Sequence, residues 1–115
     1  MTHDPSCVFC KIVAGTIPSR KVHEDDEILV FHDIAPWAPV HLLFIPKHHV
    51  PSMAEVGPQD APLLGRMMAL VPRLMRQNGA LNGFRVIVNN GVDGGQEVPH
   101  LHLHAIGGPR PWAKG

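Results

Sequence analysis

Apolar and polar residues alternate over residues 100–106, whose sequence is His-Leu-His-Leu-His-Ala-Ile. Successive side chains of a β-strand point to opposite faces, so the alternation predicts a strand with three imidazoles in a row, about 6.6 Å apart. Leu101, Leu103 and Ala105 would then face the core. A row of imidazoles can bind metals, move protons or attack electrophiles. The alternative is an exposed strand that merely carries histidine, and the uniformly apolar opposite face argues against it.

Other apolar patterns predict a chain of mixed helices and strands. Leu63 to Met75 places apolar residues at three- and four-residue steps, which predicts a long helix over 58–78 with Pro72 inside it. The remaining predicted elements are a short helix over 5–14 closed by Gly15, strands over 20–24, 28–31, 40–45 and 84–89, and one or two helical turns over 48–55. Because links between strands dominate, the fold class predicted is α+β with an antiparallel sheet.

Composition narrows the class of protein. The 115 residues suffice for a single domain, 1–115, with one core. Lys plus Arg equals Asp plus Glu, at ten each, so we expect no nucleic-acid partner. No apolar run is long enough to cross a membrane, and residues 1–6 lack the basic start and apolar segment of a signal peptide. We therefore expect a cytoplasmic protein with no membrane partner.

The two cysteines, Cys7 and Cys10, form a Cys-x-x-Cys pair. They could bind zinc, form a redox pair, or be buried helix residues. Zinc requires two more ligands, and the nine histidines of the chain can supply them. A thioredoxin-like role is disfavoured because no βαβ unit surrounds the pair. Zinc is thus favoured over the redox role.

The histidine stretch resembles the signature of the histidine triad nucleotide-binding family, His-φ-His-φ-His-φ-φ with φ apolar, and the spacing is most similar to its Hint branch. The motifs that support the resemblance follow the family's order across nearly the whole chain. They are Cys7-Val-Phe-Cys10-Lys-Ile12, Ile17-Pro18, Phe31-His-Asp33-Ile34, Ala38-Pro-Val-His41, Ile45-Pro-Lys-His-His49, Val88-Asn89-Asn-Gly91 and Asp93-Gly-Gly-Gln96.

The resemblance implies a five-stranded antiparallel sheet that pairs across a two-fold axis into a homodimer with a ten-stranded sheet. It also implies hydrolysis of purine nucleoside phosphoramidates. His102 would be the nucleophile, forming a nucleotidyl-histidine intermediate. His104 would hydrogen-bond the phosphate, and His41 would support the site. Without the resemblance, His41 is a polar residue at the start of a strand.

The resemblance further implies which residues bind the nucleotide. Asp33 would accept hydrogen bonds from the ribose hydroxyls, although alone it is a turn residue at the end of a strand. The full set consists of Phe9, Ile12, Phe31 and Ile34 around the base, Asp33 at the ribose, and Asn89, Gln96 and the backbone near Val98 at the phosphate. Taken alone, the four base residues are typical of a core.

Two further expectations follow from the resemblance. Cys7, Cys10, His49 and His100 would form a closed Cys₂His₂ site, which is the arrangement of a structural zinc ion. Position 97 departs from the pattern, since some members carry a serine that assists the leaving group and this chain has Glu97. Glu97 could take part in proton delivery, or be a surface residue.

Two alternative functions stay open at this point. One is hydrolysis of dinucleoside polyphosphates, as in other branches of the family. The other is a nucleotide- or zinc-binding module without turnover. In related dimers the C-terminal end reaches toward the partner's active site, which would place Trp112 near the leaving group.

Overall fold

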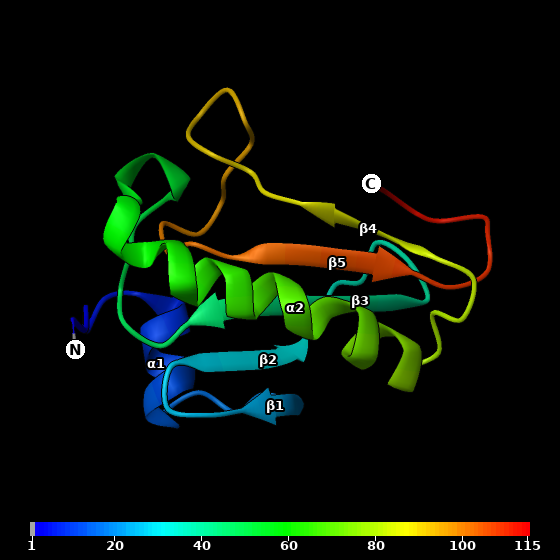
Figure 1. The fold of residues 1–115 in the computed structure, drawn as a ribbon, viewed down its shortest axis with the longest axis horizontal. Helices are drawn as coiled ribbons and strands as arrows, with labels where there is room; N and C mark the ends of the chain where they lie inside the picture. The colour runs from blue at the N-terminus through cyan, green and yellow to red at the C-terminus, as the bar shows by residue number, and fades with distance from the viewer. Residues whose placement is uncertain (1) are drawn as a thin grey trace.

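Five antiparallel strands form one sheet in the order β1-β2-β3-β5-β4 in the computed structural model, which describes residues 2–115 (Figure 1). The elements are α1 (Val8–Ala14), β1 (Lys21–Glu24), β2 (Ile28–His32), β3 (Val40–Pro46), the 3₁₀ turns η1 (Met53–Glu55) and η2 (Pro58–Asp60), α2 (Ala61–Gln77), β4 (Phe84–Ile87) and β5 (Leu103–Gly107). The predicted α+β class with a five-stranded antiparallel sheet is confirmed. Pairing of two chains stays a prediction.

The sheet is covered on both faces. Ile28 and Val30 of β2 pack in one core with α2, which lies across the sheet in Figure 1. Leu29 and Phe31, the alternate residues, pack in a second core with α1. Burial of each such side chain contributes about 1.5–3 kcal/mol, so both layers stabilise the central strands. Among the residues that the structure describes, no helix is long and apolar enough to cross a membrane.

The ends of the helices follow local chemistry. Cys7 caps the N-terminus of α1, where its Sγ accepts the backbone N–H of Cys10 at 3.4 Å. Gly15 ends the helix with a φ of 82°, a left-handed conformation that glycine adopts without a side-chain clash. Because the helix begins after Cys7, it is three residues shorter at its start than predicted.

The long helix α2 starts at Ala61, because residues 58–60 form a separate 3₁₀ turn. It continues through the exposed Pro72.

The predicted histidine strand is wrong for its first three residues, because β5 begins at Leu103. Pro99 has no N–H to donate to a ladder. The amide of His100 instead donates to Val98 O at 2.8 Å, and that of Leu101 donates to Val50 O at 2.6 Å. The imidazoles consequently do not form a regular row, and the ring of His100 lies in a different cluster from that of His104.

Two other predicted boundaries are also wrong. Of residues 48–55, only Met53–Glu55 turn as a helix, and that turn is a 3₁₀ helix. The strand β4 ends at Ile87 instead of residue 89, and a loop rich in glycine follows it. This loop places Asn89, Gly95, Glu97 and Val98 at a cavity that Asp33, after β2, and His104, on β5, also line.

Candidate functional site

A cavity of about 400 Å³ lies where β2 and β5 meet the loops after β2 and β4. That volume is within the range of small-molecule sites. The lining residues are Phe9, Asp33, Ala35, Trp37, Leu43, Asn89, Gly95, Glu97, Val98, His102, His104 and Lys114. Two of the three triad histidines are therefore exposed to the same cavity as an aspartate. The cavity therefore contains side chains that are suited to nucleophilic and acid–base chemistry.

His102 is buried and its ring is oriented by two neighbours. Its Nδ1 lies 2.7 Å from the carbonyl oxygen of His100, and since a carbonyl only accepts, Nδ1 carries the proton and donates it. The edge of the ring packs against Phe9, with ring centroids 5.2 Å apart. Burial lowers the pKa of His102, which favours the neutral ring. Nε2 therefore keeps a free lone pair.

His104 and His41 lie on neighbouring strands, and their side chains meet diagonally across the β3–β5 pair. His41 Nε2 lies 2.9 Å from His104 Nδ1. Burial, aided by the positive charges that His102, His41 and Lys114 can carry, lowers the pKa of His104 to about 3. Burial also lowers the pKa of His41. Both rings are therefore neutral near pH 7.

Asp33 follows β2 and lines the cavity. Its Oδ1 accepts the backbone N–H of Ala35 at 2.8 Å, which is the hydrogen bond of a turn-forming aspartate. Its Oδ2 lies 3.5 Å from His41 Nε2. Asp33 is thus a turn residue, and it also lines the cavity.

The other residues that the sequence pointed to are placed unequally. Phe9, Asn89 and Val98 line the cavity. Phe31 and Ile12 lie behind Phe9 in the same core, whereas Ile34 is fully exposed. The Gln96 amide is already engaged by protein groups, because its nitrogen donates to Pro51 O and Val98 O. These roles in nucleotide binding stay predictions.

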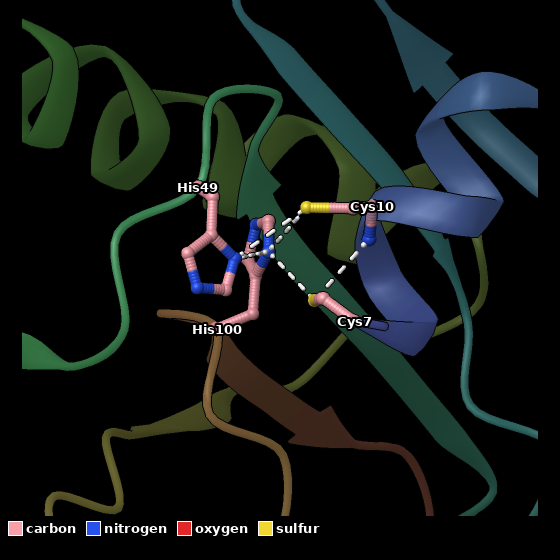
Figure 2. A group of neighbouring side chains, drawn as sticks. All are labelled: Cys7, Cys10, His49 and His100. Atoms are coloured by element: carbon pink, nitrogen blue, oxygen red, sulfur yellow. Dashed lines mark hydrogen bonds between the residues drawn. The ribbon is translucent and has the colours of Figure 1, made fainter. Parts of the chain in front are cut away.

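A second cluster brings together the four residues of the predicted metal site. Figure 2 shows Cys7 and Cys10 at the start of α1, His49 after β3 and His100 before β5, with their sulfur and nitrogen atoms facing a common point. His100 Nδ1 lies 3.3 Å from Cys7 Sγ, 3.6 Å from Cys10 Sγ and 3.3 Å from His49 Nδ1. His49 Nδ1 lies 3.4 Å from Cys10 Sγ. All four ligand atoms lie within 4.8 Å of one another, so the cluster could hold a metal ion.

The surroundings of this cluster fit a cation. The Nε2–H of His100 donates to Pro46 O at 2.8 Å, so its Nδ1 lone pair faces the two sulfur atoms. Burial lowers the pKa of His100 to about 4, which keeps that lone pair available near neutral pH. The Asp4 carboxylate lies 4.0 Å from His49 Nε2. Metal-binding histidines commonly have a carbonyl or carboxylate partner of this kind on the second nitrogen.

Two residues of the cavity were missed by sequence reasoning. Trp37, for which the sequence suggested no role, stacks on His104 with ring centroids 4.2 Å apart and planes 22° apart. Lys114, near the C-terminus, donates its backbone N–H to Trp37 O at 3.0 Å. No spacing rule connects these residues, since the contacts arise when the tail folds back on its own chain.

The C-terminal tail places Trp112 away from this cavity. Its Nε1 donates to Gly108 O at 3.0 Å, and its ring lies beside Arg85 and Arg110. There it lines a second cavity, of about 490 Å³, near Phe84 of the outer strand β4. None of the described residues that line this second cavity is a histidine, cysteine or carboxylate, so it lacks the groups for acid–base or nucleophilic chemistry.

Comparisons with known proteins cover nearly all of the chain. A family model described as "Scavenger mRNA decapping enzyme C-term binding" matches residues 6–113. Protein HitA of Neisseria gonorrhoeae is 50% identical over 104 residues, which are 90% of this chain and 97% of that protein. A HIT-like protein of Chlamydia trachomatis is 43% identical over 101 residues, 88% of this chain and 91% of that protein.

Solved structures agree with these relatives. A histidine triad protein from Clostridium difficile superposes with a TM-score of 0.89 at 40% identity, covering 96% of each chain. A HIT family hydrolase from Legionella pneumophila gives a TM-score of 0.87 at 43% identity, covering 91% of this chain and 95% of that one. Sequence and fold therefore point to the same group of proteins.

Proposed function

The chain belongs to the histidine triad family, and on that premise we propose that it is a nucleotide hydrolase or transferase that cleaves purine nucleoside phosphoramidates. The observation that carries the proposal is the orientation of His102. Its Nδ1–H is held by the carbonyl of His100 at 2.7 Å, which leaves Nε2 as a nucleophile in a ring that lines the cavity. An imidazole free to rotate would present this lone pair only part of the time.

In the proposed reaction His102 Nε2 attacks the phosphorus of the nucleotide. A nitrogen–phosphorus bond to the ring forms as the bond to the amine breaks, and the amine leaves with the electron pair and takes up a proton from water. Water then attacks the nucleotidyl-histidine and releases the nucleoside monophosphate. Hydrogen-bond donors near the phosphate oxygens stabilise the charge that develops, and His104 lines the cavity beside His102.

The cavity has groups suited to a nucleotide. Asp33 can accept two hydrogen bonds from a ribose diol. Phe9 presents an apolar surface to a base, supported by Phe31 with ring centroids 5.6 Å apart. Glu97 also lines the cavity, as an exposed residue to which we assign no catalytic role.

We assign the second cluster to a structural zinc ion. The residues that would hold it are Cys7, Cys10, His49 and His100, and the donor set of two sulfurs and two nitrogens is one that zinc prefers. Bound zinc would supply a closed four-coordinate crosslink and no open position for substrate. It would join α1 to the segment before β5, and so support the carbonyl of His100 that orients His102.

A homodimer is part of the proposal. β4 is one of the two outer strands of the sheet, and its Phe84 is 40% exposed. An unpaired outer strand can pair with its copy across a two-fold axis, which would extend the sheet to about ten strands. Sedimentation of the full chain tests this part separately.

Turnover of an adenosine phosphoramidate tests the proposed function. We expect His102→Ala to lower kcat by about 10³-fold or more, because the covalent route is lost. His23→Ala is the matched control, since His23 lies on β1 and its ring bonds Asp25. Equal turnover by wild type and His102→Ala would refute the assignment. Preference for a dinucleoside polyphosphate would favour the other branch of the family, and tight binding without turnover would favour a binding module.

A further inference from the structure

Three groups beside the cavity form a hydrogen-bonded chain that leads to His104. The backbone N–H of Trp37 lies 3.0 Å from His41 Nδ1. His41 Nε2 lies 2.9 Å from His104 Nδ1. Both imidazoles are buried, with at most 6% of either residue exposed, so water does not compete with these contacts.

The direction of the protons follows from the first group. A backbone N–H can only donate, so His41 Nδ1 must accept and carries no proton. A neutral imidazole then holds its proton on Nε2, which donates to His104 Nδ1. His104 Nδ1 is in turn an acceptor, and its own proton lies on Nε2. The lowered pKa values of His41 and His104 agree with neutral rings.

The loop that carries this amide is held in place. The indole of Trp37 stacks on His104 at 4.2 Å between ring centroids. Its carbonyl accepts the N–H of Lys114 at 3.0 Å, and the Lys114 ammonium lies 5.0 Å above the indole ring. Trp37 therefore contacts the histidine pair through its backbone and its side chain.

The geometry points to Trp37 as a positioning residue whose backbone N–H, acting through His41, fixes His104 as the Nε2–H tautomer, a hydrogen-bond donor toward the anionic phosphate of the substrate. The use of that N–H on phosphate rests on the proposed function, whereas the tautomer itself does not. His102 and His104 would then carry their protons on opposite nitrogens: one ring offers a lone pair and the next offers a donor.

These proton positions exclude a metal ion at the cluster of Asp33, His41 and His104. Asp33, His41 and His104 offer atoms that lie within 4.8 Å of one another. A cation there would require the Nε2 lone pair of His41 while Nδ1 also accepts from Trp37, and the ring would have to be an imidazolate. The hydrogen-bonded chain needs no such species.

Nitrogen NMR of the full chain labelled with ¹⁵N-histidine tests the tautomers directly. Long-range proton–nitrogen correlations distinguish a protonated from an unprotonated ring nitrogen, and His41→Asn and His104→Ala assign the signals. We expect protonated Nε2 and unprotonated Nδ1 in both His41 and His104 near pH 7. A predominant Nδ1–H form of His104 would overturn the inference.

Two substitutions separate the backbone from the indole. Trp37→Ala removes the side chain and keeps the N–H, whereas Trp37→Pro removes both. We expect Trp37→Ala to keep the tautomers, and Trp37→Pro to mix them and to lower kcat/KM by a further 10- to 100-fold or so. Wild-type tautomers in folded Trp37→Pro would contradict the role of the amide.

A second pair of variants keeps the test decisive if Trp37→Pro does not fold. In His41→Gln the side-chain amide reaches about as far as Nε2 and can donate to His104, whereas in His41→Asn it reaches only as far as Nδ1. We expect the glutamine variant to retain the His104 tautomer and the asparagine variant to lose it. Identical tautomers in both would contradict the relay through His41. If the tautomers are as expected but no phosphoramidate is cleaved, the proposed function fails and the relay stands.

Discussion

Two clusters in this fold contain histidines, and in each the possible ligand atoms lie within 4.8 Å of one another. The cysteine–histidine cluster consists of Cys7, Cys10, His49 and His100. The other cluster consists of Asp33, His41 and His104. The difference lies in which nitrogen faces the centre without a proton. His100 donates its Nε2–H outward to the carbonyl of Pro46, so its lone pair faces inward.

His41 has the opposite arrangement. Its Nδ1 accepts from the Trp37 amide, so a proton points inward from Nε2. Closeness of possible ligand atoms is therefore not enough to make a metal centre. A single backbone group, the Pro46 carbonyl beside His100 and the Trp37 amide beside His41, sets which ring nitrogen keeps a lone pair toward its cluster.

The largest expected effect comes from breaking the cysteine–histidine cluster. Cys10→Ser should lower the bound zinc per chain and the free energy of unfolding by about 4 kcal/mol or more, because a structural metal contributes to folding. Asp33→Asn, which alters only the cluster of Asp33, His41 and His104, should keep full zinc content. Zinc analysis and thermal unfolding measure both. Equal zinc loss in the two variants would contradict the distinction between the clusters.

Removal of His104 should affect turnover and spare the metal. His104→Ala deletes one donor to the phosphate, so we expect kcat/KM to fall about 10²-fold with zinc content unchanged. Steady-state kinetics with an adenosine phosphoramidate, together with zinc analysis, provides the measurement. A variant with wild-type kcat/KM would show that His104 is not a phosphate ligand.

The sequence predicts the fold of this chain well because periodicity reports burial. The three- and four-residue steps from Leu63 to Met75 predict α2, and the apolar runs at 28–31 and 40–45 predict β2 and β3. The predicted start of β5 is wrong because alternation does not reveal that the amides of His100 and Leu101 donate to Val98 O and Val50 O instead of to a neighbouring strand. Family motifs indicated the metal cluster, whose four residues the structure brings together.

The proton positions could not be predicted from the sequence. They depend on backbone groups, Pro46 O and Trp37 N, that any residue type with the same conformation could supply. The contact of Lys114 with Trp37 likewise joins positions 77 residues apart in the chain and follows no periodic rule.

Acid should destabilise the protein partly through His104. Its pKa is about 3 in the folded chain and near 6.5 when unfolded, so the unfolded state binds the proton more readily. The contribution of His104 to the free energy of unfolding is therefore fully present above about pH 6.5. It falls as pH decreases toward 3, by at most about 1.4 kcal/mol per pH unit. His104→Gln has no such group, so its free energy of unfolding should fall less steeply. Denaturant unfolding between pH 7 and pH 4 compares the slopes, and parallel curves would contradict the account.

The smallest expected effect concerns Glu97, whose side chain is exposed at the mouth of the cavity. As a surface residue it should tolerate substitution, and we expect Glu97→Gln to change kcat/KM by less than about threefold. A general acid typically contributes 10²-fold or more, so a loss of that size, confined to substrates with basic amine leaving groups, would instead identify Glu97 as the proton donor.

The covalent intermediate is the most direct test of the central claim. The full chain is mixed with an adenosine phosphoramidate labelled in the nucleoside, quenched within one turnover, and its peptides are analysed by mass spectrometry under conditions that preserve phosphorus–nitrogen bonds. The account predicts label on His102 and none in His102→Ala. Release of the monophosphate with label on another residue, or with no labelled peptide at any time, would contradict it.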